Sequence, residues 1–384
     1  MRIEWQIAFW LGAFFLLGLL LWLFSGVLLP FAAAVALGYL LDPVADRLER
    51  LGLNRLGATL LILAVFIVLV VAIFILIVPI LGHQLAGFIQ SLPDYILKLQ
   101  ALISKQSEWL AKEYGGAFFE KLGLGLGHGG APDLSGPTSD LVAQAAQWGA
   151  GFLKSLWSRG AALISLISLI VVTPVVAFYM LLDWDKMIRT IDSLVPLRHR
   201  ATVRELAREI DAAMAGFLRG QSLVCLFLGL WYGLGLSLIG LNFGLLIGIT
   251  AGFLSFIPYV GSLTALILAA SVAIVEDWPQ WHLLAMALGV VFTGQFLEGN
   301  ILSPKLVGES VGLHPVWLIF ALLAFGSLFG FTGLLTAVPL AAAAGVILRF
   351  AVKRYRESQL YTGLEDQPAK IFHDVTVLHA KDER

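Results

Sequence analysis

The stretch "GLLIGITAGFLSFIPYVGSLTALILAASVAIV", residues 244–275, belongs to a longer run, 220–275, that contains no charged side chain. A helix of roughly 20 apolar residues crosses a hydrocarbon core about 30 Å thick. The run is therefore long enough for two full membrane spans or three short ones. Pro258 and Gly261 interrupt it, and we expect the helix to break there because proline lacks an N–H donor and blocks the next helical turn.

The rest of the chain has the same character. Of its 384 residues, 59% are hydrophobic and 13% are charged, whereas a soluble domain carries about 25% charged residues. The sequence predicts an all-α polytopic membrane protein with about eight transmembrane helices, short broken or re-entrant hairpins and an amphipathic helical region outside the membrane. The further charge-free runs are 5–41, 56–82, 160–182, 278–297 and 311–348.

The composition excludes several classes of function. A formal net charge of −1 offers no basic face for nucleic acid. The single cysteine, Cys225, excludes an intramolecular disulfide and a cysteine metal site. Walker, HExxH and paired mid-span aspartate motifs do not occur in the sequence. We therefore expect no nucleotide-driven pump, no intramembrane enzyme, no metal and no cofactor.

Lysine and arginine cluster between particular apolar runs. They gather at 42–55, at 183–216 and from 349 onward, whereas the short links between other runs lack them. The positive-inside rule therefore places these segments and both termini in the cytoplasm. The segment 83–159 also carries lysines, but it is too long for the rule to apply, and the parity of the flanking spans places it outside the cytoplasm.

Two segments outside the spans have helical periodicity. Apolar residues of 85–103 recur every three or four positions, which predicts a helix that continues out of the preceding span and packs on a partner helix or a neighbouring subunit. In 199–218, Thr202 and Glu205 form a capping-box pair. This second helix either lies at the inner headgroup surface or couples movement between the two halves of the protein.

These features divide the chain into six segments. The segments are N-terminal spans at 1–82, an extracytoplasmic amphipathic helical region at 83–159, a span at 160–182, a cytoplasmic amphipathic linker helix at 183–218, a C-terminal bundle with broken helices at 219–350 and a cytoplasmic tail at 351–384.

Two interruptions of apolar runs mark candidate positions for a transport site. Irregular backbone is not tolerated in lipid, so such breaks are buried in protein, line an aqueous cavity or lie at the interface. Paired breaks are typical of transporter sites built from discontinuous helices, although ordinary interfacial loops would give the same pattern. The residues are Pro258, Tyr259 and Gly261 in the first run and Gly330, Gly333 and Pro339 in the second.

A polar stretch, "GQFLEGNILSPKLVG" at 294–308, follows the run 278–297. Gln295 and Glu298 are three residues apart and share a helix face. Glu298 lies either among the lipid headgroups or in a recessed, water-filled vestibule, where its carboxylate could exchange a proton with a moving substrate or ion. Pro304 with Gly308 is expected to turn the chain into the next hairpin. The candidate pathway residues in and near this stretch are Gln221, Gln295, Glu298, Asn300 and Pro304.

Several motifs together resemble one family. They are "TPVVAFYMLLDWDKM" at 173–187, "GFLSFIPYVGS" at 252–262 and "GQFLEGNILSPKLVGESVGLHPVWLIFALLAFGSLFGFTGLLTAVPLAA" at 294–342. Through them the chain is similar, along most of its length, to the autoinducer-2 exporter (AI-2E) family of bacterial permease-like proteins. The resemblance implies an inner-membrane protein with about eight spans that exports small molecules and forms homo-oligomers, with a pentamer as one candidate. The motif positions in this chain are Gln221, Pro258, Gly261, Gln295, Glu298, Asn300, Pro304, Pro315, Gly330, Gly333 and Pro339.

The expected function is therefore a permease that exports a small polar solute, such as a quorum-sensing signal, at the expense of an ion gradient. A Na⁺(K⁺)/H⁺ antiporter is the first alternative, although such proteins generally need carboxylates in mid-span. A non-transporting envelope scaffold, with 83–159 as its working part, is the second. The expected partners are the lipid bilayer, a small-molecule or ion substrate and further copies of the chain.

Overall fold

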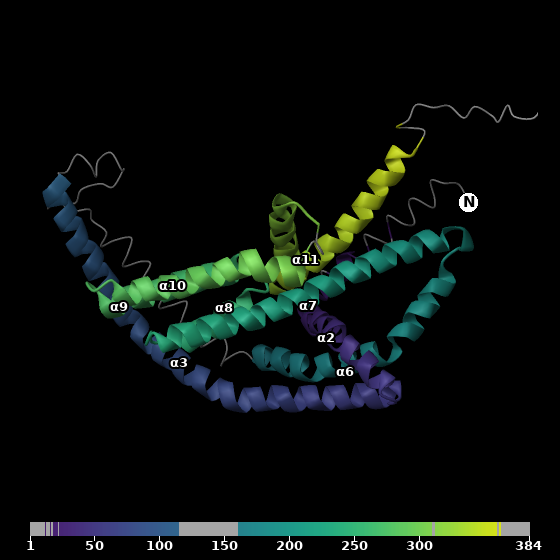
Figure 1. Cartoon of the computed structure of the whole chain (residues 1–384), viewed down its shortest axis with the longest axis horizontal. Coiled ribbons are helices and arrows are strands. Elements are labelled where there is room, and N and C mark those ends of the chain that lie inside the picture. The colour runs from purple at the N-terminus through teal and green to yellow at the C-terminus, as the bar shows by residue number, and fades with distance from the viewer. Residues whose placement is uncertain are drawn as a thin grey trace, which may run out of the picture.

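The computed structural model describes residues 18–21, 23–114, 160–308 and 312–358, together with Gly12, Leu16 and Tyr361. Every regular element in these residues is a helix, which confirms the all-α fold (Figure 1). The helices are α2 (Ser25–Arg50), α3 (Arg55–Tyr114), α6 (Gly160–Leu194), η1 (Leu197–His199), α7 (Arg200–Leu238), α8 (Gly244–Leu254), α9 (Val260–Asp277), α10 (His282–Leu297), the π-helical η2 (Glu298–Val307) and α11 (Pro315–Arg356).

Six helical segments of the described residues are long and apolar enough to cross a membrane. They are Leu28–Arg50, Arg55–Tyr95, Leu197–Leu238, Val260–Asp277, His282–Val307 and Pro315–Arg356. Helix α6 contains the predicted span 160–182, and only part of the run 5–41 lies in the described residues. The polytopic architecture is confirmed, and the number of eight spans stays a prediction.

Helix α3 joins two segments that the sequence analysis assigned to different regions. It continues without interruption from Arg55 to Tyr114, so the helix at 85–103 grows directly out of the span before it, as predicted. The helix packs on the C-terminal bundle: Phe88 lies edge-on against Phe243, with ring centroids 5.4 Å apart, and Tyr95 donates a hydrogen bond to Glu276 at 3.0 Å. The remainder of the region, 115–159, lies outside the described residues.

The membrane-facing part of α3 carries its apolar side chains outward. Ile75 is 72% exposed and Leu76 is 69% exposed. Apolar side chains in a contiguous exposed band are covered by lipid or by another protein surface. This part of α3 therefore supplies outer surface rather than core.

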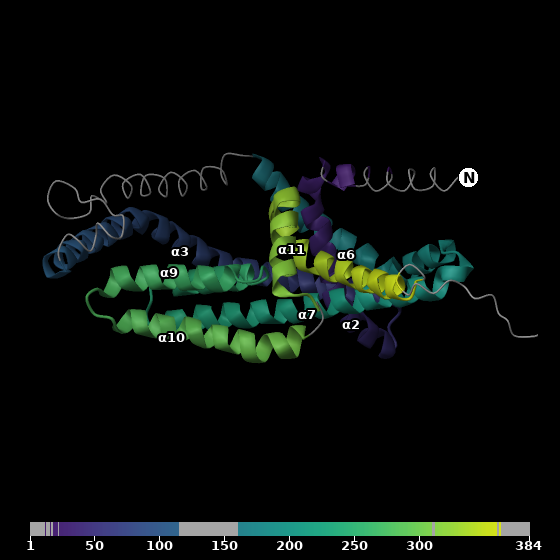
Figure 2. The same ribbon diagram turned by 90° about the horizontal axis from the view of Figure 1, so that it is seen from above.

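Two clusters of buried apolar residues hold the helices together. The larger lies among α7, α8, α9 and α10 around Leu228 and Val291, and Figures 1 and 2 show α7, α9 and α10 running side by side. The smaller joins α2, α3 and α6 around Ala34 and Ala177. A third group around Phe217 connects α7 to α11 and α2. Helix α7 thus packs against both the N-terminal helices and the C-terminal bundle, and α3 contacts the bundle as well.

Helices α7 and α8 approach each other through glycine. A Cβ at Gly248 would overlap the backbone of Gly233, and one at Gly252 would overlap Gly229. Small residues at a membrane helix interface allow the two backbones to pack closely, and dispersion contacts over that surface then hold the pair together. The glycines of this part of the sequence therefore serve packing and not chain flexibility.

The predicted interruption at 258–261 is present. Helix α8 ends at Leu254 and α9 begins at Val260, with Tyr259 in the left-handed region at φ 68°. In α11 the break is confined to Gly330, whose φ of 58° and ψ of −137° are not helical, and Figure 2 shows the two arms of α11 meeting there at a sharp bend. The expectation that Gly333 and Pro339 also split this run is wrong, because the chain stays helical at both.

Two local expectations also differ from the structure. Residues 200–218 are not a separate surface helix but the first half of α7, which begins after His199 without a side-chain cap, so the Thr202–Glu205 capping box does not form. Pro304 lies inside η2 and does not end it; the chain turns at Gly308, where φ is 58°. The ring of Pro304 supplies no N–H, so η2 forms without one of its backbone hydrogen bonds.

Candidate functional site

The polar stretch at 298–307 packs directly on α7. A Cβ at Gly220 would overlap the backbone carbonyl of Leu306, so only glycine lets η2 approach α7 so closely. The contact places the residues that follow Gly220 on α7 beside η2. The sequence analysis named one of these residues, Gln221, whose hydrogen-bond partner lies directly after the end of α8.

Gln221 is 8% exposed and its Nε2 donates a hydrogen bond to the carbonyl oxygen of Ser255 at 2.6 Å. Ser255 follows the last residue of α8, where the helix break leaves carbonyl oxygens without intrahelical donors. The Ser255 hydroxyl donates to Ala251 O at 2.8 Å, and a Cβ at Gly261 would overlap it. The structure therefore brings Gln221 and Gly261 together around Ser255, a residue that the sequence analysis did not single out.

Glu298 is the first residue of η2 and is partly buried. No hydrogen bond or ion pair joins Glu298 to another residue that the structure describes. The segment His282–Val307 is one candidate span, and Glu298 lies in its second half; whether the carboxylate lies among the headgroups or in a vestibule stays a prediction.

Tyr232 is the polar residue of this interface that the sequence analysis missed. It is fully buried, and its hydroxyl has no hydrogen-bond partner among the described residues. Its ring occupies space that only a glycine leaves free, since a Cβ at Gly294 would lie 2.9 Å from the Tyr232 hydroxyl oxygen. Gly294 and Glu298 are four residues apart and share a helix face. This spacing of a glycine and a carboxylate was the feature of the sequence that could have indicated a close contact here.

The other predicted residues do not join this group through hydrogen bonds. Gln295 is partly buried without a hydrogen bond to Glu298, and Asn300 is exposed and donates to Phe296 O at 3.0 Å. Tyr259 is 62% exposed beside the half-buried Pro258.

The predicted residues of α11 occupy another place. Gly330 is exposed at the bend, and Gly333 is buried where a Cβ would overlap the carbonyl oxygen of Phe325. Pro339 is buried next to Val338, which packs against Phe217 of α7. These residues shape the α11 bend and its contact with α7.

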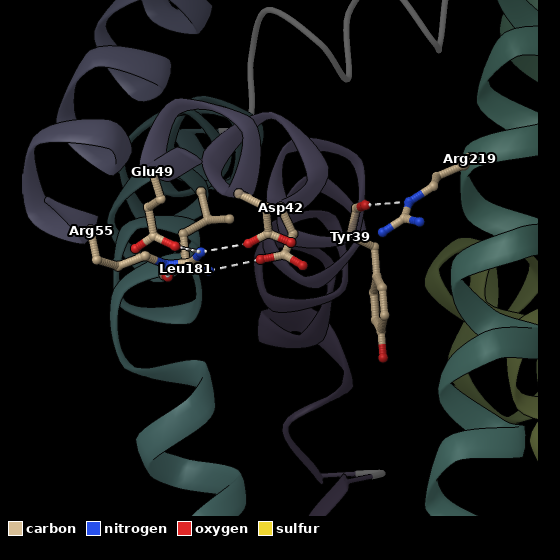
Figure 3. Close-up of polar contacts among 7 residues, drawn as sticks. Tyr39, Asp42, Glu49, Arg55, Leu181 and Arg219 are labelled. Carbon is tan, nitrogen blue, oxygen red and sulfur yellow. Dashed lines mark hydrogen bonds and ion pairs between the residues drawn. The ribbon is translucent and has the colours of Figure 1, made fainter. Parts of the chain in front are cut away.

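A second polar site lies where α2, α6 and α7 meet. Arg55 donates to the carboxylates of Asp42 at 2.8 Å, Asp46 at 2.9 Å and Glu49 at 3.4 Å, and to Leu181 O at 2.8 Å. Figure 3 shows this guanidinium reaching α2 from one side. One arginine thus ties the start of α3 to both α2 and α6, which the sequence analysis read only as a basic loop.

On the other side of α2, Tyr39 is held at both ends. Arg219 Nε donates to the backbone carbonyl of Tyr39 at 2.8 Å (Figure 3), and the Tyr39 hydroxyl donates to Asp211 at 2.9 Å. The ring also lies edge-on to Trp184, with centroids 6.2 Å apart. These side chains line a half-open pocket of about 80 Å³ together with Asp42.

The turn between α6 and α7 is clamped by charge. Asp192 accepts hydrogen bonds from Arg200 at 2.6 Å and from Arg204 at 2.7 Å. Bonds to the charged carboxylate favour it, so Arg204 and Arg200 hold the pKa of Asp192 well below its usual range. In the residues that the structure describes, no group of three or more His, Cys, Asp or Glu side chains could hold a metal ion.

Comparison with known proteins agrees with this architecture. The family model described as "AI-2E family transporter" matches residues 9–353. YrrI of Bacillus subtilis strain 168 is 29% identical over 351 residues, covering 87% of this chain and 90% of that protein. PerM of Escherichia coli strain K12 is 27% identical over 332 residues, covering 86% and 88%. Their names describe the first as a transport protein and the second as a permease. This multi-pass helical chain therefore belongs to the AI-2E family of transporters.

Proposed function

We propose that the chain is a secondary transporter that exports a small polar solute, of the kind that includes quorum-sensing signals, and draws its energy from an ion gradient. The observation that carries the proposal is Glu298, a partly buried carboxylate inside the candidate span His282–Val307. A carboxylate at such a position is costly to keep and generally serves an ion or substrate pathway.

Two polar side chains of α7 suit a pathway along the contact between α7 and η2. Gln221 offers an amide, and Tyr232 offers a hydroxyl without a partner among the described residues. The α8–α9 break adjoins Gln221 through Ser255. Backbone groups freed at such a break can bind substrate in transporters with discontinuous helices. In this proposal Glu298 exchanges the coupling proton while the neighbouring amide and hydroxyl contact the solute.

A Na⁺(K⁺)/H⁺ antiporter is the second candidate function. The sequence analysis weighed against it because no carboxylate was placed in mid-span. The position of Glu298 within the segment His282–Val307 supports it, because exchange of a cation for a proton needs one ionisable group that both can occupy in turn. The scaffold alternative depends on 83–159, much of which lies outside the described residues.

The proposed setting is a bacterial inner membrane with both termini in the cytoplasm, as the distribution of lysine and arginine favours. Homo-oligomers, including a pentamer, also belong to the proposal. The exposed apolar band on α3 around Leu76 supplies surface that lipid or a neighbouring copy would cover.

The test uses the purified protein in liposomes that contain a pH-sensitive dye. Opposed gradients of sodium, potassium and candidate polar solutes are imposed on the wild type, on Glu298→Gln and on the control Glu357→Gln, whose carboxylate is exposed at the end of α11. We expect proton movement that depends on a solute gradient, is lost in Glu298→Gln and persists in the control.

The outcomes separate the candidates. Proton movement driven by sodium or potassium alone, and lost in Glu298→Gln, would establish the antiporter instead of the exporter. Gradient-driven movement that survives in Glu298→Gln would exclude Glu298 as the coupling group. An absence of movement with every gradient would contradict ion-coupled transport and favour the scaffold.

A further inference from the structure

The last two turns of α11 carry a dense group of cations. The four basic residues are Arg349, Lys353, Arg354 and Arg356, and Glu357 is the one acidic residue of 349–358. All five side chains are exposed. Arg354 pairs with Glu357 at 3.9 Å, whereas no ion pair joins the other three cations to a residue that the structure describes. The end of α11 therefore carries an excess of positive charge.

The three remaining cations lie on one side of the helix. Arg349 and Lys353 are four residues apart, and Lys353 and Arg356 are three apart, so the three share a helix face that extends about 10 Å along the axis. We call Arg349, Lys353 and Arg356 the cationic face of α11. An open hollow of about 510 Å³ runs along it, lined by Leu348, Arg349, Val352, Lys353, Arg356 and Glu357. The hollow thus combines the cations with two exposed apolar side chains, Leu348 and Val352.

The cationic face lies where α11 leaves the hydrocarbon. Helix α11 is a candidate span, and its sequence contains no charged residue from Pro315 to Leu348. The first cation is the next residue. Tyr355 and Tyr361 are exposed and lie edge to face with ring centroids 5.6 Å apart, and tyrosine is enriched at the level of the lipid headgroups. In Figure 1 this end of α11 stands away from the other helices, which leaves lipid as its immediate neighbour.

The phosphate of an anionic phospholipid fits this surface in charge and in polarity. Arginine and lysine both bind phosphate oxygens through charge-assisted hydrogen bonds, and a cluster of four or more such residues directly beside a span attracts anionic lipid. A zwitterionic headgroup carries its own cation, which the cationic face repels. Leu348 and Val352 supply apolar contact for the acyl chains, which a soluble phosphate lacks.

We propose that the cationic face of α11 binds the headgroup of an anionic phospholipid, with the phosphate against Lys353 and Arg356 and the acyl chains along Leu348 and Val352. The surface is separate from the proposed transport pathway, and its test measures lipid binding alone. Either proposal can therefore fail without the other.

Native mass spectrometry of the full-length protein in a neutral detergent tests the proposal. The protein is titrated with dioleoylphosphatidylglycerol or dioleoylphosphatidylcholine, which share their acyl chains and differ in net charge. At low salt we expect the anionic lipid to bind about tenfold more tightly, and this preference to shrink as salt is raised. Inorganic phosphate at the concentration of the lipid should not displace it.

Variants connect the preference to the cationic face. The double variant Lys353→Gln, Arg356→Gln removes two cations and keeps a residue of similar helix propensity at each position, so we expect most of the preference to be lost. The matched control Arg198→Gln, Arg208→Gln makes the same change in net charge. Both control residues are exposed and lie more than ten residues before the apolar run 220–275, so the control should bind both lipids as the wild type does.

Each contrary outcome overturns the proposal in a different way. Equal binding of the two lipids by the wild type would exclude a lipid site and leave an acidic protein segment as the occupant. Displacement of the lipid by inorganic phosphate would assign a site for soluble phosphate. A preference that survives in the double variant, or that falls equally in the control, would place the selectivity elsewhere on the chain.

Discussion

Replacing Tyr232 by phenylalanine removes one oxygen atom from the core of the α7–α10 interface, and the structure predicts opposite effects on stability and on transport. The hydroxyl is fully buried and has no partner among the described residues. A buried polar group without a partner costs about 1–3 kcal/mol. Tyr232→Phe abolishes this cost and leaves only a void of one oxygen atom, so we expect a net gain of about 1 kcal/mol in the free energy of unfolding.

The expected shift in melting temperature follows from chain length. An unfolding entropy of about 2.1 cal/mol/K per residue gives roughly 0.8 kcal/mol/K for 384 residues, so a gain of about 1 kcal/mol raises Tm by about 1 °C. Transport should fall in the same variant. If the hydroxyl contacts the solute or Glu298 during the cycle, losing that charge-assisted contact slows proton movement about tenfold.

A matched control is present in the same chain. Thr59 on α3 is also fully buried, and its hydroxyl likewise has no partner among the described residues. Thr59→Val should raise Tm by a similar amount and leave proton movement in liposomes unchanged. A lower Tm for Tyr232→Phe would mean that its hydroxyl has a stabilising partner, and unchanged transport would remove it from the pathway. Either result refutes the reasoning.

Three further changes test the packing and the charge network. Gly248→Ala places a Cβ against the backbone of Gly233 and should destabilise the protein by about 2 kcal/mol or more, whereas Gly289→Ala, which has open space around it, should leave Tm unchanged. Arg55→Gln leaves three carboxylates without their shared partner. We expect it to lower the free energy of unfolding by about 2 kcal/mol, less than the loss of a fully buried ion pair because these groups are partly exposed to solvent. The lowered pKa of Asp192 means that its ion pairs stabilise the fold above the unfolded pKa of about 4 and cease to do so as pH falls toward the native pKa. The Tm difference between wild type and Asp192→Asn should therefore be constant near neutrality and disappear in acid; a constant difference down to acid pH would contradict the clamp.

Hydropathy predicted the helices and their interruptions well because both depend on local chemistry. A long charge-free run favours a membrane helix, and Pro258, which lacks the N–H donor of a helical turn, lies in the break between α8 and α9. The break at Gly330 was predictable for the same kind of reason, since only glycine adopts its backbone angles readily. Pro339 shows the limit of this argument, because it lies in a helix whose packing against α7 outweighs the loss of one donor.

The candidate site was predictable only in part. Glu298 and Gln221 stood out as polar groups beside apolar runs, but the partner of Gln221 is a backbone carbonyl oxygen at Ser255, which no side-chain pattern reveals. Tyr232 looked like one more aromatic residue of a span, and its missing partner is visible only when the helices are packed. The pocket around Tyr39 combines residues that are far apart in sequence, such as Asp42 and Asp211, so no local motif could have indicated it.

One turn of α7 joins the two sites, and it lies where hydropathy suggested a boundary. Arg219 is the last basic residue before the apolar run, and the sequence analysis placed the end of the linker at 218, yet α7 passes through this point unbroken. Residues two apart on a helix point in roughly opposite directions. Arg219 accordingly holds Tyr39 on the α2 side, while Gln221 holds Ser255 at the α8 break. A movement of this turn would change the pocket and the polar end of the proposed pathway together, because both are fixed to the same rigid stretch of backbone.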